Sequence, residues 1–423
     1  MPRTSKALGG VRSDLLERVS WRRLWLRAVI ALTAFAMLPA RVALSGGGID
    51  PDTRFTPLAA AVLTQPQAVR ATDGAYHLAY EVLLTNATPQ RVEITAVEVR
   101  DGRSHRPLLT LTGPALPNQM NPIGVSFEDP GDSSIASSSV SIVWLDVAVR
   151  SRAEIPRVLE HRITGSIVAA PVGASIPFEI VVARIPTSEA KPPVLGPPVG
   201  PGIWLASEGC CRDVTHHRRG LVPVNGELSV AQRFAIDFFR LDDQFRTWVD
   251  DPTKRDSYLS YGQPILAAAD GVVVNVRDGL HDQSPPQTPP IPPIDETVGN
   301  HVIVRIAPDV YVLYGHMKQG SVLVSKGERV RRGQELGRIG TSGNSTTPHL
   351  HFQTLTTATF FPTDSTPYVF EAFTLVGKES ARIWDDNVGL QPTGTIPVSP
   401  VAPTQFRNTM PLDRDIIIFP KSR

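Results

Sequence analysis

Short runs of alternating apolar and polar residues dominate the amino-terminal half of the chain, at 76–83, 92–97, 139–144 and 178–182. Such alternation is typical of β-strands with one buried face, because successive side chains of a strand point to opposite sides. Gly, Pro, Asn and Asp residues separate the runs and favour turns. The pattern therefore predicts an antiparallel β-sandwich over residues 54–185.

A second series of short strands is predicted further along the chain, at 264–268, 271–276, 301–306, 310–314 and 334–339. We expect these strands to form a second, mainly β domain over 204–380. A proline-rich insertion at 284–293 interrupts it and is typical of a surface loop. Residues 381–423 are expected to form a polar tail, whose strand-like end at 416–419 docks on one of the two domains.

The two series are separated by residues 191–201, which read KPPVLGPPVGP. Proline and glycine at this density favour an extended, stiff connection. We therefore predict a linker over 186–203 and a mainly β protein with two folded domains.

The composition excludes some classes of partner. The chain has 423 residues, of which 41% are hydrophobic, so it is long enough for two or three domains with hydrophobic cores. Its formal net charge is only +1. Nucleic acids and anionic membrane surfaces attract strongly basic proteins, so the charge argues against both as partners. The sequence does not indicate an oligomeric state.

The amino terminus is typical of an export signal. Seven basic residues precede the apolar run 28–38, namely Arg3, Lys6, Arg12, Arg18, Arg22, Arg23 and Arg27. The run is shorter than a membrane span, and the small residues Ala43 and Ser45 follow it. We predict a signal peptide over 1–45 and a mature protein in the periplasm, the cell envelope or the extracellular space. Contact with the membrane is expected only through an uncleaved signal segment.

The only two cysteines are neighbours, Cys210 and Cys211. Export would place them where oxidation is possible, but a disulfide between adjacent residues is geometrically demanding. The sequence leaves a disulfide and two free thiols as alternatives.

Candidate chemistry is concentrated beyond the linker, where seven of the ten histidines lie. His349 and His351 stand two positions apart in a strand-like run, so both imidazoles project from one face. His316 ends another apolar run, and Asp237 interrupts a third. A carboxylate inside an apolar strand is costly unless it is paired or binds a metal. Asp237 and His351 are candidate members of a catalytic zinc shell, which has three protein ligands and one open position.

Six motifs occur in order between residues 218 and 354: AID at 235–237, PILAAADGVV at 264–273, GNHV at 299–302, YGHM at 314–317, VSKGERVRRGQ at 324–334 and SGNSTTPHLHF at 342–352. Together they resemble the lysostaphin/LytM-type zinc endopeptidases of peptidoglycan, peptidase family M23. The resemblance implies a small β-rich domain, a duplicated hybrid motif, with a groove that binds zinc. It also implies cleavage of peptide cross-links in bacterial cell walls.

The resemblance implies roles for four residues. Asp237 corresponds to the aspartate of the family's His-x-x-x-Asp motif and His351 to the second histidine of His-x-His, so both are implied zinc ligands. His316 and His349 correspond to the family's two catalytic histidines. Histidine suits that role because its charge changes near neutral pH. Zn²⁺ is the implied cofactor, and peptidoglycan peptides are the implied substrate.

Arg233 departs from the family pattern, because the histidine of His-x-x-x-Asp would fall on it. A guanidinium stays protonated and has no lone pair for a metal. Either another residue supplies the third ligand or the site is broken. The candidates are His216 and His217, which precede a strong hairpin signal at Asn225-Gly226.

A hairpin there would bring the histidine pair beside the strand that holds Asp237. In an unbulged register His216 would share the face of Asp237, whereas a bulge would exchange the faces and present His217. The run His-Arg-Arg followed by Gln-Arg-Phe-Ala-Ile-Asp is similar to that of a divergent group of exported M23-like proteins, which favours His217. The predicted metal ligands are therefore His217, Asp237 and His351.

Two hypotheses about function follow. The first is an exported zinc metalloendopeptidase that hydrolyses peptide cross-links of peptidoglycan through a zinc-activated water. In the second, the domain is a non-catalytic LytM-like module that binds wall peptides or regulates a partner wall hydrolase, and Arg233 is its main support. The intact set of His316, His349, His351 and Asp237 favours the enzyme, because a module without catalysis has no need of all four.

Overall fold

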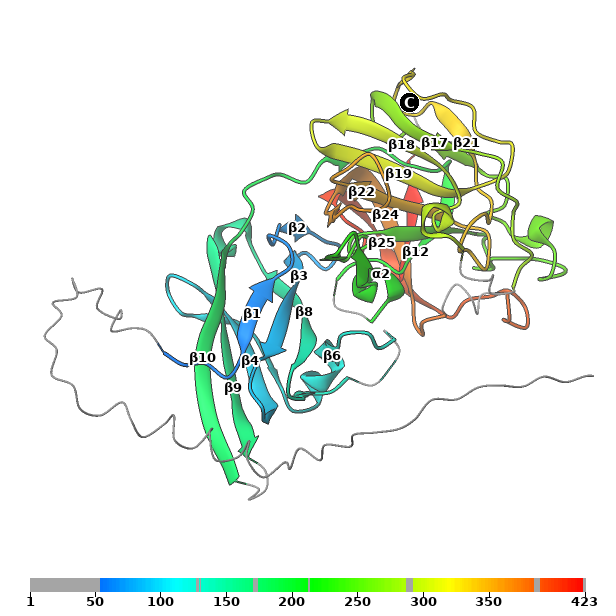
Figure 1. The fold of residues 1–423 in the computed structure, drawn as a ribbon. Coiled ribbons are helices and arrows are strands. Elements are labelled where there is room, and N and C mark those ends of the chain that lie inside the picture. The colour runs from blue at the N-terminus through cyan, green and yellow to red at the C-terminus, as the bar shows by residue number, and fades with distance from the viewer. Residues whose placement is uncertain are drawn as a thin grey trace, which may run out of the picture. The chain divides into compact units, whose positions relative to one another are not determined.

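The computed structural model describes residues 54–126, 129, 131–169, 174–211, 214–286, 292–383 and 389–420. The predicted signal peptide and the middle of the proline-rich insertion lie outside these residues. Among the described residues, no helix has the length and apolar character needed to cross a membrane. Strands make up most of the regular structure, which confirms the predicted mainly β fold (Figure 1).

Two five-stranded antiparallel sheets form the amino-terminal part, residues 56–186, called here the two-sheet region. One sheet contains β1 (Ala59–Val62), β2 (Val69–Arg70), β3 (Tyr76–Asn86), β6 (Met120–Pro122) and β8 (Ser139–Val149). The other contains β4 (Arg91–Asp101), β5 (Pro107–Thr112), β7 (Ser134–Ile135), β9 (Val158–Ala169) and β10 (Ala174–Pro186). Alternate residues of both sheets, such as Leu78 and Val97, meet in one hydrophobic cluster. The four predicted strand runs lie in β3, β4, β8 and β10.

A twelve-stranded sheet forms most of the remaining described chain. Its order is β11 (Val194–Leu195), β24 (Val369–Glu379), β26 (Asp415–Phe419), β12 (Gly202–Ser207), β15 (Ile236–Leu241), β22 (Leu350–Leu355), β19 (Val310–Met317), β18 (Asn300–Ala307), β17 (Gly271–Arg277) and β20 (Arg329–Val330). Two further strands, β23 (Ser365–Thr366) and β25 (Val398–Thr409), pair with β22 and β24. Two short pairs stand beside it, β13 (Val222–Val224) with β14 (Glu227–Ser229) and β16 (Pro264–Leu266) with β21 (Glu335–Arg338).

All five strand runs predicted beyond the linker are present, as β16, β17, β18, β19 and β21. The strand-like end of the predicted tail docks as β26, between β24 and β12. Its apolar residues Ile416, Ile417 and Phe419 are buried there, which explains why this segment joins the sheet. The predicted domain limits stay predictions.

Alternation along the central strands separates a polar face from the core. On β15, Asp237 lies between Ile236 and Phe238, and on β22, His351 lies between Leu350 and Phe352. Phe238 and Phe352 pack against Phe370, with ring centroids 6.0 and 5.9 Å from that of Phe370. Because neighbouring residues of a strand point to opposite faces, the aromatic cluster supports the sheet directly behind Asp237 and His351.

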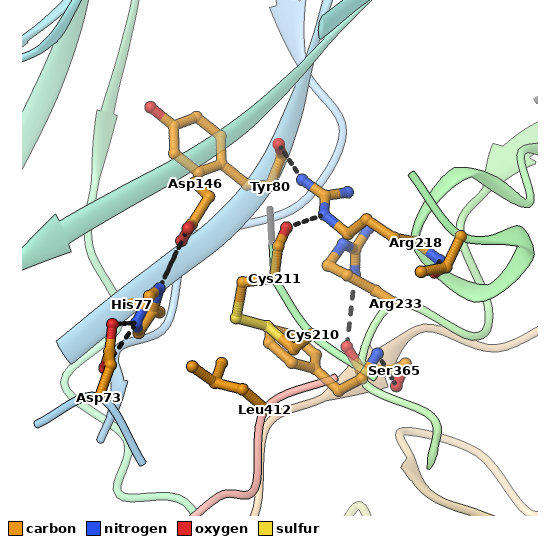
Figure 2. Close-up of a disulfide and its surroundings, with 12 residues drawn as sticks. Asp73, His77, Tyr80, Asp146, Cys210, Cys211, Arg218, Arg233, Ser365 and Leu412 are labelled. Atoms are coloured by element: carbon orange, nitrogen blue, oxygen red, sulfur yellow. Dashed lines mark hydrogen bonds and ion pairs between the residues drawn. A yellow bond between two sulfur atoms is a disulfide. The ribbon is translucent and has the colours of Figure 1, made fainter. Parts of the chain in front are cut away.

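Cys210 and Cys211 form a disulfide in the segment after β12, next to Leu412 (Figure 2). Both residues are buried and belong to the hydrophobic cluster of the large sheet. Of the two alternatives that the sequence left open, the structure therefore contains the disulfide.

Acid sensitivity is expected from His161, on β9 of the two-sheet region. Its side chain is fully buried, with Nε2 bonded to the Tyr80 hydroxyl at 2.9 Å and Nδ1 to the carbonyl of Ala183 at 3.0 Å. Burial lowers its pKa from 6.5 to about 4. Below pH 6.5 His161 is protonated in the unfolded chain but stays neutral in the folded chain. The free energy of unfolding should therefore fall by about 3 kcal/mol by about pH 4 because of His161.

Urea unfolding of the full chain at several pH values between 7 and about 4 measures this loss. The variant His161→Gln should show a shallower fall in the free energy of unfolding over that window, whatever its stability at pH 7. An unchanged slope would contradict the neutral, buried state of His161.

Candidate metal centre

Three adjacent strands present the candidate site on one face of the large sheet. Asp237 of β15 is the register partner of His351 of β22, and His351 is in turn the partner of Gly315 of β19. A side chain at position 315 would place its Cβ 2.5 Å from Val298 Cγ2 and 3.3 Å from His351 Cβ. Glycine is therefore needed beside His351, which accounts for Gly315 immediately before His316 in β19.

His316, the next residue, has an unusual backbone conformation. Its φ is 55°, in the left-handed region, which costs a non-glycine residue about 1–3 kcal/mol. Two backbone hydrogen bonds hold it: His316 N–H donates to Val298 O at 2.9 Å, and Gly340 N–H donates to His316 O at 3.0 Å. Strain of this kind concentrates at functional positions. It turns the imidazole of His316 towards that of His349, at a centroid distance of 4.9 Å.

His217 approaches the same carboxylate from outside the sheet. It lies on a one-turn helix, α2 (His216–Arg219), whose N-cap Thr215 accepts a hydrogen bond from Arg218 N–H at 3.0 Å. His217 Nε2 lies 3.4 Å from Asp237 Oδ2, and His217 Nδ1 donates to the carbonyl of Glu208 at 3.1 Å.

The hairpin at Asn225-Gly226 is present, but it does not carry the histidine pair. Strands β13 and β14 are three residues each, and β13 begins at Val222, after the helical turn that holds His217 has ended at Arg219. The register argument that linked the two histidines to opposite faces of a long hairpin is therefore wrong. The helical turn of α2, not a β-bulge, directs His217 to Asp237.

Hydrogen bonds leave one bare nitrogen on each of three imidazoles. The Nδ1 atoms of His217, His316 and His349 donate to backbone carbonyls, those of Glu208, Ser342 and Thr347, at 3.1, 2.8 and 2.8 Å. Their Nε2 atoms are then lone-pair acceptors. His349 Nε2 lies 3.5 Å from Asp237 Oδ2. Carbonyl partners of this kind orient histidines that ligate metals or transfer protons.

His351 has the opposite tautomer. Its Nε2 lies 2.8 Å from Gln353 Oε1, and the amide nitrogen of Gln353 donates to Ala231 O at 2.8 Å. That second bond fixes Gln353 Oε1 as the acceptor, so His351 Nε2 carries the proton and Nδ1 is bare. Nδ1 of His351 faces Asp237 Oδ1 at 3.0 Å. Two acceptors at this distance need a proton or a metal ion between them.

The charges at the site favour a bound cation. Burial lowers the pKa of His217 and of His316 well below the usual value for histidine, so both are neutral at pH 7. Burial alone would raise the pKa of Asp237, but His217, His349 and His351 lower it well below its usual range. An ionised carboxylate surrounded by imidazole nitrogens is a suitable setting for a divalent metal.

Three side chains fit a metal of zinc's preference. His217 Nε2 and His351 Nδ1 lie 3.4 and 3.0 Å from the oxygens of Asp237, close to the roughly 3.3 Å between ligand atoms of a tetrahedral zinc. His217 Nε2 is buried and has no hydrogen-bond partner among the described residues. A buried, unsatisfied lone pair of this kind is expected of a ligand. The set of two nitrogens and one carboxylate leaves the fourth position open.

His216 stays close to the same point. Its Nδ1 lies 3.3 Å from Glu208 Oε2, and ligand atoms of His216, His217 and Asp237 all lie within 4.8 Å of one another. His217 is the more buried of the two histidines, and its Nε2 lies 3.4 Å from Asp237 Oδ2. The geometry therefore favours His217 as the third ligand, and His216 stays a second candidate.

Four of the predicted residues, Asp237, His316, His349 and His351, line one small cavity of about 50 Å³, large enough for a water molecule, whereas His217 is not part of its lining. Its lining is His216, Gln232, Asp237, Thr297, Val298, His316, Asn344, His349, His351 and Phe360. Sequence reasoning missed Gln353, which fixes the tautomer of His351. The strand alternation could have found it, because residues 349, 351 and 353 share one face.

Arg233 forms ion pairs with carboxylates rather than binding a metal. Its guanidinium donates to both carboxylate oxygens of Glu81 at 2.7–3.1 Å and also contacts Asp364. The position that the family fills with a histidine is thus a buried ion pair here.

Residues 256–361 match the model of peptidase family M23. Among curated proteins, the chain is 31% identical over 98 residues to the peptidoglycan DD-endopeptidase ShyA of Vibrio cholerae serotype O1, covering 23% of this chain and 19% of that protein. It is 33% identical over 131 residues to the DD-carboxypeptidase/endopeptidase Mpg of Neisseria meningitidis serogroup B, covering 30% of this chain and 26% of that protein. The chain carries an M23 peptidase domain. It spans about a fifth to a quarter of the length of these relatives.

Solved structures give weaker likenesses. The catalytic domain of lysostaphin from Staphylococcus simulans aligns with a TM-score of 0.21 at 20% identity, covering 40% of this chain and 86% of that one. A zinc-containing peptidase from Vibrio cholerae aligns with a TM-score of 0.17 at 14% identity, covering 48% and 79%. The family assignment rests on the matched domain and the sequence relatives.

The ligand assignment predicts different effects for the two adjacent histidines. The full chain should bind about one zinc, His217→Ala should lose it, and His216→Ala should keep it, because the buried Nε2 of His217 lies 3.4 Å from Asp237 Oδ2. Metal content after dialysis, measured by mass spectrometry, gives the answer. Loss in His216→Ala with retention in His217→Ala would assign the ligand to His216 instead.

Proposed function

We propose that this protein is a zinc metalloendopeptidase that hydrolyses peptide cross-links of peptidoglycan. The observation that carries the proposal is the arrangement of bare nitrogens around Asp237. His217 Nε2, Asp237 and His351 Nδ1 would hold the metal, while the Nε2 atoms of His316 and His349 face the same cavity. Zinc bound there would lower the pKa of a coordinated water towards about 7 and polarise the scissile carbonyl.

The chain's own residues would manage the protons. His349 donates from Nδ1 to Thr347 O, which leaves Nε2, next to Asp237, as the atom that can take the proton of the attacking water. The resulting imidazolium keeps its Nδ1–H bond to Thr347 O and can pass the proton to the leaving amine. His316 Nε2 is also bare, so it is a second proton acceptor at the cavity and could donate a hydrogen bond to the developing oxyanion only after taking up a proton there. Peptide hydrolysis needs these transfers at neutral pH, which neutral histidines allow.

The substrate class is supported by the relatives. The first is named a peptidoglycan DD-endopeptidase and the second a DD-carboxypeptidase/endopeptidase. A wall substrate also agrees with the predicted signal peptide, which would place the enzyme in the periplasm or cell envelope. In this proposal the two-sheet region is exported together with the peptidase domain, to the cell wall.

Replacement of His349 should separate chemistry from metal binding. His349→Ala should reduce hydrolysis of purified peptidoglycan by about 10²–10⁴-fold, because the proton acceptor is lost, and should keep the zinc. Release of soluble muropeptides, followed by liquid chromatography, measures the rate. His281→Ala is a suitable control, since His281 is exposed and bonded to Gln319.

Activity equal to wild type in His349→Ala would remove the proposed mechanism. The non-catalytic alternative predicts a different result, namely a chain that binds peptidoglycan fragments but releases no product from any wall preparation. Arg233 no longer supports that alternative specifically, because its pairing with Glu81 gives it a structural role.

A further inference from the structure

We propose that Glu81, in the two-sheet region, is a positioning residue for the metal centre, acting on His217 and Asp237 through Arg218 and Arg233. The proposal rests on the proposed function and extends it. The two-sheet region then forms part of the framework of the site rather than a separate attachment module.

Glu81 lies on β3 and is fully buried. Its Oε1 accepts from Arg218 Nη1, and its two oxygens accept from Arg233 Nε and Nη2 at 2.7–3.1 Å. Both guanidinium groups are 2% exposed. One carboxylate thus compensates two buried cations, with Asp364 assisting at Arg233. Burial would raise the pKa of Glu81, but Arg233 and Arg218 lower it, so it is ionised.

Both arginines are close in sequence to proposed metal ligands. Arg218 follows His217 directly on α2, and Arg233 precedes Asp237 by one turn of chain at the entry to β15. Glu81 therefore links the segments that carry two of the three ligands. The sequence separations are 137 and 152 residues, so only the folded chain brings the three side chains together.

Helix α2 depends on such contacts, since a helix of four residues is not stable alone. Arg218 makes most of them: Nη2 donates to Tyr80 O at 3.0 Å and to Leu145 O at 2.9 Å, and Nε donates to Cys211 O at 3.1 Å. Figure 2 shows Arg218 between Tyr80 of β3 and Cys211. Arg219 adds a bond to Asn121 Oδ1 of β6 at 3.0 Å.

The position of His217 follows from this arrangement. His217 shares a single helical turn with Arg218 and Arg219, so an anchored turn leaves its imidazole little freedom besides the bond to Glu208 O. Preorganised ligands bind metals more tightly, because less conformational entropy is lost on binding. Arg233 restricts the start of β15 in the same way, and with it the position of Asp237. Arg233 thus stands where the family has a histidine ligand and holds the start of β15 in place. We infer that His217, the proposed ligand on α2, depends on this arrangement.

The test compares two buried carboxylates of the two-sheet region in the full chain. Glu81→Gln removes the charge that holds both arginines. Glu160→Gln is the matched control, because Glu160 is equally buried but pairs with His105 and Arg184 inside the same region. We expect Glu81→Gln to weaken zinc binding about 10–100-fold in competition with a chromogenic chelator, and Glu160→Gln to leave it within about twofold of wild type.

A second variant avoids unpaired buried charge. Arg218→Lys keeps a cation near Glu81 but loses the guanidinium fork that reaches Tyr80 O, Leu145 O and Cys211 O. It should weaken zinc binding in the same direction. Substitution of Co²⁺ should also give a visible spectrum altered from wild type in both variants, which a merely structural loss of stability would not produce.

Amide exchange of the metal-free chain tests positioning without any zinc. Residues 214–220 should exchange faster in Glu81→Gln and Arg218→Lys than in wild type and Glu160→Gln. Unchanged exchange and unchanged zinc affinity in both variants would overturn the positioning role. A wild-type chain that binds no zinc, with faster α2 exchange in the variants, would instead overturn the proposed function and leave the anchoring by Glu81 standing.

Discussion

The buried carboxylate of Asp237 is the centre on which the candidate site depends. It lies on a strand whose neighbours are apolar, and bare imidazole nitrogens approach it within 3.0–3.5 Å from three histidines. Two acceptors of this kind stay face to face only with a proton or a metal ion between them. The aromatic cluster behind β15 and β22 keeps the face rigid, and backbone carbonyls or Gln353 set each tautomer. The chemistry proposed for the protein follows from this one constraint.

The second constraint is the pairing of Glu81 with Arg218 and Arg233. It changes the meaning of the arginine at the family's usual ligand position. That arginine is buried, ion-paired and bonded to a carbonyl of β23 as well, so it takes part in packing rather than in coordination. The absence of a histidine at position 233 and the ion pair with Glu81 of the two-sheet region are thus two aspects of one substitution. Buried ion pairs often fix a particular conformation more than they add stability. Here the ion pairs of Glu81 would fix the position of α2.

The sequence predicted the fold class and most of the site, because the signals were local. Alternation of apolar and polar residues located β3, β4, β8 and β10, and ordered motifs located His316, His349, His351 and Asp237. The third ligand was harder. The hairpin signal at Asn225-Gly226 was correct, but α2 has only four residues and therefore no helical periodicity to detect. The preference for His217 came from resemblance, whereas the register argument attached to it was wrong.

By itself, the sequence determined which residues share a strand face, since a two-residue period follows from covalent geometry. It thus determined that His349 and His351 project together and that Asp237 is a polar residue in an apolar strand. Only the tertiary structure decided that Cys210 and Cys211 form a disulfide, that α2 directs His217 to Asp237, and that Arg233 pairs with Glu81. The physical reason is that long-range ion pairs and hydrogen bonds depend on three-dimensional proximity, which no local pattern of residues encodes.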